Sequence, residues 1–228
     1  MTSIEAVGVH KTHGGVGTPP ALRGVDIRFL PGELTVLAGP SGSGKTTLLS
    51  IMGGYDHVDR GAIRFGDPLP RDISAPELDW RRMGYLPQAL VLLDELTIAQ
   101  NVQLPVQLAR EPLPEHLVDE KYTRIWLERL ELSHLADRFP TETSGGEQQR
   151  TALARALRLE PTVLLADEPT GQLDASRVGI VLEVLREYAR TGATVVITSH
   201  DPVVIAAADT VITMADGEVV DRSRQRRT

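Results

Sequence analysis

Short apolar runs bounded by glycine and proline occur near both ends of the chain and predict β-strands. These runs cover residues 4–9, 25–30, 34–38, 62–65, 85–87, 163–166, 194–198 and 210–214. Between several of them, apolar residues recur at helical spacing, which predicts helices over residues 46–52, 145–158 and 175–190. Strands that alternate with helices are typical of an α/β fold with a parallel sheet covered on both faces.

The middle of the chain has a different pattern. Across residues 97–142, leucine, isoleucine and valine recur at helical spacing, and Pro112 and Pro114 interrupt the pattern. We therefore expect an inserted helical subdomain between the strand-rich parts. Near the C-terminus, Asp216-Gly217 separates two apolar runs and predicts a small β-hairpin.

A glycine-rich loop follows the apolar run 34–38 and precedes the predicted helix. Its sequence fits the phosphate-binding pattern G-x-x-x-x-G-K-[ST], with residues Gly39, Pro40, Ser41, Gly42, Ser43, Gly44, Lys45, Thr46 and then Thr47. Glycines let successive backbone N–H groups turn inward onto phosphate oxygens at a helix N-terminus. We expect Lys45 to reach the β- and γ-phosphates and Thr46 to ligate Mg²⁺. A flexible glycine–serine loop would need neither the strand before it nor the helix after it.

Two carboxylates close the apolar run near residue 163. Asp167 and Glu168 follow Val163-Leu-Leu-Ala, and parallel strands present ligands at their carboxyl ends. Asp167 can hold Mg²⁺ there, and Glu168 can orient or deprotonate a water molecule. An acidic pair that only faces solvent is the competing interpretation, and the phosphate-binding loop elsewhere in the chain argues against it.

The composition excludes several other classes of protein. The chain has 228 residues, 41% of them hydrophobic, and no cysteine, so disulfides, thiolate metal sites and cysteine nucleophiles are excluded. The formal net charge of −7 argues against nucleic acid as a partner. There is neither an apolar run of membrane-spanning length nor an apolar signal core, so we expect a cytoplasmic chain.

The stretch Ser144-Gly145-Gly146-Glu147-Gln148 resembles the signature motif of ATP-binding cassette (ABC) ATPases. It lies shortly before the acidic strand, where that family carries it. Thr143 or Ser144 would also cap the helix that starts at residue 145. Several further stretches, such as Met52-Gly-Gly-Tyr-Asp56, resemble the ATPases of lipoprotein-release and macrolide-export permeases.

Other family elements follow in the expected order. Gln88 matches the Q-loop, Asp174 the D-loop aspartate, and His200 the switch histidine after an apolar strand. Asp201-Pro202 also matches the N-cap and first residue of a following helix.

The chain departs from the family pattern at three positions. His13 stands where an aromatic residue usually stacks on adenine. Thr143 replaces the usual leucine before the signature serine, and Gln172 stands where this subfamily often has asparagine.

The resemblance implies a P-loop NTPase fold for residues 1–228 as one ABC ATPase domain. That fold has a mixed or parallel α/β sheet core, an N-terminal antiparallel β subdomain and an inserted α-helical subdomain. Residues 1–88 and 160–221 would form the catalytic core with the β subdomain. Residues 89–159 would form the helical subdomain with the signature helix, and residues 222–228 a basic tail.

The resemblance also implies how the residues share the work. Lys45, Thr46 and Asp167 would bind Mg-ATP, with Gln88 as a further metal ligand. Glu168 would act as general base, Gln88 would address the water, and His200 would contact the γ-phosphate. The signature of a second copy, including Ser144, Gly145, Gly146 and Gln148, would close over that phosphate with the help of Asp174. ATP would therefore hold a homodimer together.

The partner implied by the resemblance is a separate integral membrane permease. The helical insertion and the segment around Gln88 would dock on it, which places the chain on the inner face of the cell membrane. A permease-linked ATPase that drives signalling or cell-envelope mechanotransmission without moving a solute is the alternative. A small-molecule kinase would have no use for Ser144–Gln148 or His200.

Overall fold

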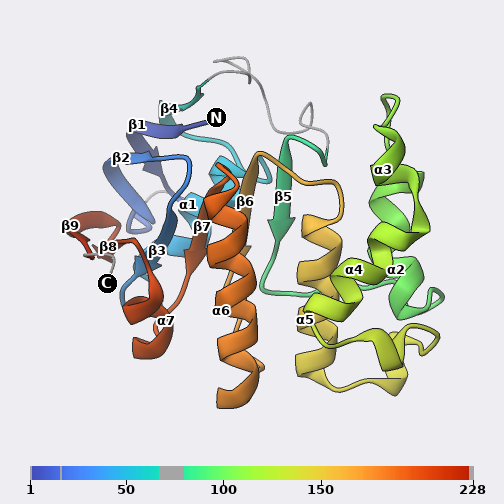
Figure 1. Ribbon diagram of the computed structural model, residues 1–228. Helices are drawn as coiled ribbons and strands as arrows, with labels where there is room; N and C mark the ends of the chain where they lie inside the picture. The colour runs from blue at the N-terminus through green and yellow to red at the C-terminus, as the bar shows by residue number, and fades with distance from the viewer. Residues whose placement is uncertain (1, 16, 67–79, 226–228) are drawn as a thin grey trace.

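The computed structural model describes residues 2–15, 17–66 and 80–225 (Figure 1). A six-stranded sheet with the order β5-β6-β7-β3-β8-β9 forms the centre of the molecule. Its strands are β3 (Leu34–Ala38), β5 (Met83–Leu86), β6 (Val163–Asp167), β7 (Thr194–Thr198), β8 (Thr210–Ala215) and β9 (Glu218–Arg224). The first five are parallel to their neighbours, and β9 runs antiparallel to β8. The expected parallel core is confirmed.

A separate three-stranded antiparallel sheet with the order β2-β1-β4 lies at the N-terminal side of the molecule (Figure 1). It consists of β1 (Ile4–Lys11), β2 (Leu22–Phe29) and β4 (Arg60–Phe65). Strand β1 pairs antiparallel with both neighbours. This is the antiparallel subdomain that the resemblance implied.

Alternate residues of the central strands point into two different apolar cores. Val36 belongs to one core together with residues of the helices α5 (Gly145–Leu157), α6 (Ala175–Arg190) and α7 (Pro202–Ala207). Its neighbour Leu37 packs with α1 (Lys45–Met52) and with the antiparallel sheet, through residues such as Phe29. Because side chains alternate along a strand, α1 and α5 cover opposite faces of the central sheet.

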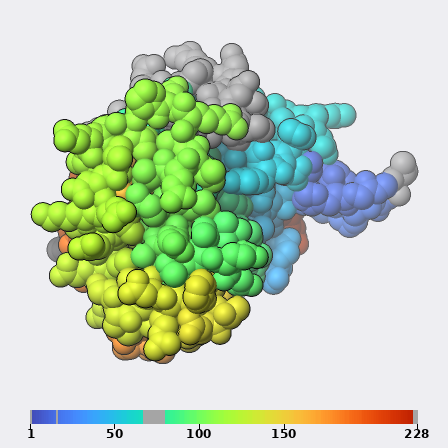
Figure 2. Space-filling model, turned by 90° about the vertical axis from the view of Figure 1, so that its right-hand side faces the viewer, coloured from blue at the N-terminus to red at the C-terminus, as the bar shows by residue number. Residues whose placement is uncertain are grey.

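The inserted segment is helical, as expected. It holds α2 (Ile98–Gln107), α3 (Glu115–Val118), α4 (Glu120–Arg129) and two 3₁₀ turns at Ser133–Leu135 and Pro140–Glu142. Trp126 and Leu127 of α4 join the same core as α5 and α6. Figure 2 shows this part as one lobe, green to yellow, beside the blue N-terminal strands.

The C-terminal segment differs from the expected tail. Strand β9 continues to Arg224, so residues 222–224 belong to the sheet. Arg224 pairs there with the buried carboxylate of Glu33. Residues 226–228 lie outside the described residues. The predicted hairpin is confirmed, since Asp216 and Gly217 have φ values of 49° and 81° at the turn between β8 and β9.

Across residues 2–15, 17–66 and 80–225, no helix combines the length and the apolar character needed to span a bilayer.

A buried amide fixes the start of the helical segment. Asn101 is fully buried, and its side chain bonds the N–H and C=O of Leu93 and the C=O groups of Leu96 and Thr97 at 2.9–3.1 Å. Asn101→Ala would remove all four bonds, although alanine favours helix. The C=O groups of Leu93 and Thr97 would keep the backbone N–H groups of Leu96 and Asn101, but the N–H of Leu93 and the C=O of Leu96 would lose the amide that pairs them. We expect the free energy of unfolding in urea to fall by about 2–4 kcal/mol. Gln107→Ala, at an exposed position of the same helix, should change it by less than about 0.5 kcal/mol. Equal effects of the two variants would contradict this role.

Candidate functional site

At two positions of the glycine-rich loop, the backbone has a positive φ and also leaves no space for a Cβ. Gly39, directly after β3, has a φ of 138°, and a Cβ there would lie 2.1 Å from the carbonyl oxygen of Met214. Gly44, the N-cap of α1, has a φ of 99°, and its Cβ would lie 2.6 Å from the carbonyl oxygen of Ala21. The loop is therefore wrapped closely by its neighbours, as a cradle of backbone N–H groups at a helix N-terminus requires.

The ammonium group of Lys45 lies inside this loop. It donates to the carbonyl oxygens of Gly39 at 2.9 Å and Pro40 at 2.8 Å, and the residue is 8% exposed. A positive charge therefore sits against the loop whose N–H groups are suited to an anion. This is the place that the sequence predicted for a phosphate-binding lysine.

The end of β6 brings the acidic motif to the loop. Asp167 is 2% exposed, and its carboxylate accepts a hydrogen bond from Thr46 Oγ1 at 3.2 Å across 121 residues of sequence. It also accepts one from the hydroxyl of Thr198, its register partner on β7. A hydroxyl and a carboxylate in contact at the end of a phosphate-binding loop form a donor set that suits Mg²⁺.

Glu168 begins a sharp turn after β6. Its φ of 49° is unusual for a non-glycine residue, and its N–H donates to Thr198 Oγ1 at 2.9 Å. The carboxylate lies 2.9 Å from Nδ1 of His200, whose own side chain is 77% exposed. This hydrogen bond and the negative charge of Glu168 raise the pKa of His200. The structure thus brings together the acidic turn and the histidine after β7, a contact that the sequence did not predict.

Gln88 lies just beyond the end of β5 and is exposed. Strand β5 pairs in parallel with β6, with Leu86 opposite Ala166. Gln88 therefore leaves the sheet at the same edge as Asp167 and Glu168.

The signature segment forms the start of α5. Ser144 caps the helix by accepting from the N–H of Glu147, and the Glu147 carboxylate accepts from the N–H of Ser144. The side-chain amide of Gln148 donates to the carbonyl oxygens of Pro140 and Thr143, so it braces the turn before the helix. Since α5 and α1 cover opposite faces of the sheet, the signature segment and Lys45 approach the sheet edge from opposite sides.

The D-loop packs against the signature glycines of the same chain. A Cβ on Gly145 would lie 2.5 Å from Oε1 of Gln172, and one on Gly146 would lie 3.0 Å from the carbonyl oxygen of Gln172. Asp174 caps α6 by accepting from Ser176 Oγ and from the N–H of Arg177. The hydrogen bond from Ser176 lowers the pKa of Asp174. The departure at Gln172 therefore fills the space beside the signature glycines.

His13 lies beside the loop helix. Its Nε2 is 3.3 Å from Thr47 Oγ1, its Nδ1 is 3.8 Å from Asp56, and its side chain is 54% exposed. The histidine is thus next to the residue that follows Thr46, with much of its ring open to solvent.

Comparison with known proteins agrees with this geometry. The family model described as ABC transporter matches residues 22–171. The chain belongs to the ABC transporter family. It is an ATP-binding and ATP-hydrolysing cassette of that family.

Individual relatives cover nearly all of the chain. It is 35% identical to the bacitracin export ATP-binding protein BceA of Halalkalibacterium halodurans, over 99% of the chain and 92% of the relative. It is 39% identical to the macrolide export ATP-binding/permease protein MacB of Chlorobium luteolum over 98% of its length, but spans only 34% of that longer protein. The ATP-binding cassette MJ0796, solved as a post-hydrolysis dimer with ADP and Pi, superposes with a TM-score of 0.86 at 32% identity, covering 99% of this chain and 100% of that one.

Two residues that contact the candidate site were not predicted from the sequence. Thr198 holds both Asp167 and the N–H of Glu168, and its only sequence signal is its position at the end of an apolar strand. Gln149 directly follows the signature segment Ser144–Gln148, and its side-chain amide donates to the carbonyl oxygen of Glu168 and accepts from the N–H of Gln172.

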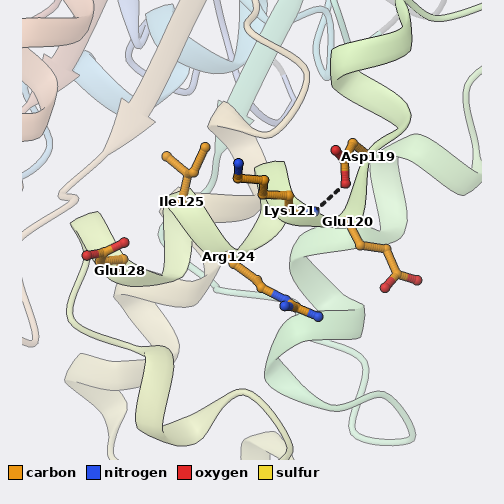
Figure 3. Close-up of a pocket in the computed structure, with 6 residues that line it drawn as sticks. All are labelled: Asp119, Glu120, Lys121, Arg124, Ile125 and Glu128. Carbon is orange, nitrogen blue, oxygen red and sulfur yellow. Dashed lines mark hydrogen bonds between the residues drawn. The ribbon is translucent and has the colours of Figure 1, made fainter.

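A surface pocket elsewhere on the ABC ATPase does not involve these groups. It lies on the outer side of α4 (Figure 3) and is lined by Asp119, Glu120, Lys121, Arg124, Ile125 and Glu128. It contains neither the glycine-rich loop nor a residue of the acidic turn, so it lies apart from the candidate phosphate site.

The contact between Glu168 and His200 makes a pH-dependent prediction. Glu168→Gln removes the carboxylate, so the pKa of His200 should fall toward its ordinary value of about 6.5. Because folding raises this pKa, the contact stabilises the protein fully below about pH 6.5 and is lost as the pH rises through the folded-state pKa. NMR titration of the His200 imidazole measures its pKa in the wild type and in Glu168→Gln. Glu142→Gln, which removes an exposed partner of Arg138, should leave the titration unchanged, and an unshifted midpoint in Glu168→Gln would contradict the assignment.

Proposed function

We propose that this ABC ATPase binds Mg-ATP at the sheet edge described above and uses it to close a homodimer that drives a separate membrane permease. The contact between Thr46 and Asp167 carries this proposal, because it joins the phosphate loop to the acidic strand. Gly39–Thr47 form the phosphate cradle, and Lys45 neutralises the β- and γ-phosphates.

Thr46, Asp167 and Gln88 are the proposed ligands of the magnesium ion. Thr46 and Asp167 already touch, and Gln88 leaves the sheet at the same edge. When bound, Mg²⁺ supplies positive charge that offsets the negative charge developing on the transferred phosphoryl group.

Glu168 is the proposed general base. It takes a proton from the attacking water, while Gln88 orients that water and His200 contacts the γ-phosphate. The hydrogen bond between His200 and Glu168 supports this pairing, because it holds the two side chains at one point of the site. Phosphoryl transfer to water depends mainly on such positioning and on charge neutralisation.

The dimer supplies the remaining phosphate contacts. Ser144, Gly145, Gly146 and Gln148 of a second copy are proposed to close over the γ-phosphate, with Asp174 at the seam. The placement of α1 and α5 on opposite faces of the sheet supports this arrangement. The relative MJ0796 was solved as a dimer. A two-fold dimer would use the same two surfaces on both copies.

His13 is proposed to lie against the adenine. Its contact with Thr47 places the imidazole beside the phosphate loop, and its ring is partly open to solvent. An imidazole offers less stacking area than tyrosine or tryptophan, so the base would be held more loosely than in relatives with a larger ring.

The permease is proposed to dock on the helical subdomain and on the segment around Gln88. Exposed apolar residues lie in that region. Tyr55 is 71% exposed, and the centroid of its ring lies 4.5 Å from that of Tyr85, while Val91 is 66% exposed. Arg155 of α5 donates to the carbonyl oxygens of Leu90 and Val91, which fixes this segment to the signature helix. Docking would hold the chain at the inner face of the membrane.

The relatives favour transport over signalling without a solute. BceA and MacB carry names for bacitracin and macrolide export, and another relative, CysA of Xylella fastidiosa, is named for sulfate and thiosulfate import. These substrates belong to those proteins. The direction of transport here therefore depends on the permease.

Replacing the loop lysine tests nucleotide binding. Lys45→Ala should weaken ATP binding by about 30-fold or more, because losing one partner of a desolvated charge pair costs about 2–5 kcal/mol. Isothermal titration calorimetry with Mg-ATP measures the affinity. Lys121→Ala removes the same charge from the outer face of α4 and should bind ATP as the wild type does. Unchanged affinity in Lys45→Ala would overturn the site.

Replacing the proposed base tests hydrolysis and dimer closure together. Glu168→Gln should retain ATP binding, lose turnover by at least about 100-fold and accumulate as an ATP-bound dimer. Light scattering after size-exclusion chromatography, with and without Mg-ATP, measures the dimer. Glu218→Gln, at an exposed position on β9, should behave like the wild type. A Glu168→Gln protein with wild-type turnover would remove Glu168 from catalysis.

A further inference from the structure

The side chain of Gln149 spans two loops of the site from inside the protein. Gln149 lies in the second turn of α5 and is 4% exposed. Its Nε2 donates to the carbonyl oxygen of Glu168 at 2.7 Å, and its Oε1 accepts from the N–H of Gln172 at 2.9 Å. One amide therefore bonds both ends of the turn between β6 and the D-loop.

The turn that Gln149 holds is strained at Glu168. A φ of 49° is disfavoured for a residue with a side chain, because the Cβ then lies too close to the following carbonyl oxygen. The N–H of Glu168 donates to Thr198 Oγ1, and its carbonyl oxygen accepts from the N–H of Gly171 as well as from Gln149. These three hydrogen bonds fix the two peptide groups that flank the Glu168 side chain. They consequently set the direction in which its carboxylate leaves the backbone.

We propose that Gln149 is a positioning residue for ATP hydrolysis, which holds the Glu168 carboxylate in its working orientation. This inference rests on the proposed role of Glu168 as general base. Gln149 touches neither nucleotide nor water in this scheme and acts only through the Glu168 turn. Gln149 also connects that turn to α5, whose first residues carry the signature. In the proposed dimer, the helix that contacts the partner's ATP is therefore the helix that holds the Glu168 turn of its own chain.

The chemistry of the site requires an amide at position 149. The carbonyl oxygen of Glu168 needs a donor, and the N–H of Gln172 needs an acceptor. The NH₂ and the C=O of a single side-chain amide supply both. Methionine has a similar length but replaces neither hydrogen bond. An ionised glutamate could still accept from Gln172, but it would turn a negative oxygen toward the Glu168 carbonyl.

The test compares Gln149→Met and Gln149→Glu with the wild type in steady-state hydrolysis of Mg-ATP by the full chain. We expect kcat to fall by about 10- to 100-fold, as is typical when a group that orients an active residue is lost. The KM for ATP and its affinity by calorimetry should change by less than about threefold, because the phosphate loop is untouched. Gln149→Glu keeps the size of the side chain and serves if Gln149→Met does not fold.

Adding Gln149→Met to the Glu168→Gln variant distinguishes a positioning role from a general loss of structure. In Glu168→Gln, the single-turnover rate should fall by less than about twofold when Gln149→Met is added, because the group that Gln149 positions is already gone. Thr151→Val is the matched control: Thr151 is fully buried on the same helix and donates to the carbonyl oxygen of Glu147. That variant should keep kcat within about twofold of the wild type.

Three results would overturn the inference. They are a kcat within about twofold of the wild type in both Gln149 variants, an equal loss on the Glu168→Gln background, or the same loss in Thr151→Val. If Glu168→Gln itself hydrolyses ATP at the wild-type rate, the proposed function fails at Glu168. If Glu168→Gln is inactive while Gln149→Met is active, only the role of Gln149 fails.

Discussion

The buried carboxylate of Asp167 holds the two halves of this ATPase together. It accepts from Thr46 at the start of α1 and from Thr198 at the end of β7. The first contact ties the phosphate loop to the acidic strand, and the second ties that strand to its neighbour. A buried carboxylate is costly without such partners. The start of α1 and the end of β7 therefore meet at one oxygen atom, Oδ1 of Asp167.

The local parts of this site could be predicted from the sequence, because each of them is formed by residues that are consecutive in the chain. The glycines of the phosphate loop, Lys45 and the acidic end of β6 each carry their own signal, and the parallel sheet places them at one edge. The cap at Ser144 and the hairpin at Asp216 are likewise short-range effects. The individual roles of the site residues stay predictions.

Long-range pairings could not be predicted in the same way. Thr198 contacts Asp167 only because of the register between β6 and β7, and Gln149 contacts Glu168 only because of how α5 packs on the sheet. The basic end of the chain shows the same limit. The sequence predicted a basic tail that includes Arg222 and Arg224, whereas in the structure both residues belong to β9, which pairs with β8. The charge of a segment does not predict whether a distant strand is available to pair with it.

At the proposed nucleotide site, the sequence separation between Thr46 and Asp167 also links nucleotide recognition to the completion of folding. Their contact spans 121 residues and depends on the register of β6 and β7, so it requires the non-local pairing of the sheet. A partly folded chain can hold the glycine-rich segment but not the carboxylate opposite it. Nucleotide then binds the finished fold in preference to earlier states, and by mass action it shifts the population of chains toward the native cassette.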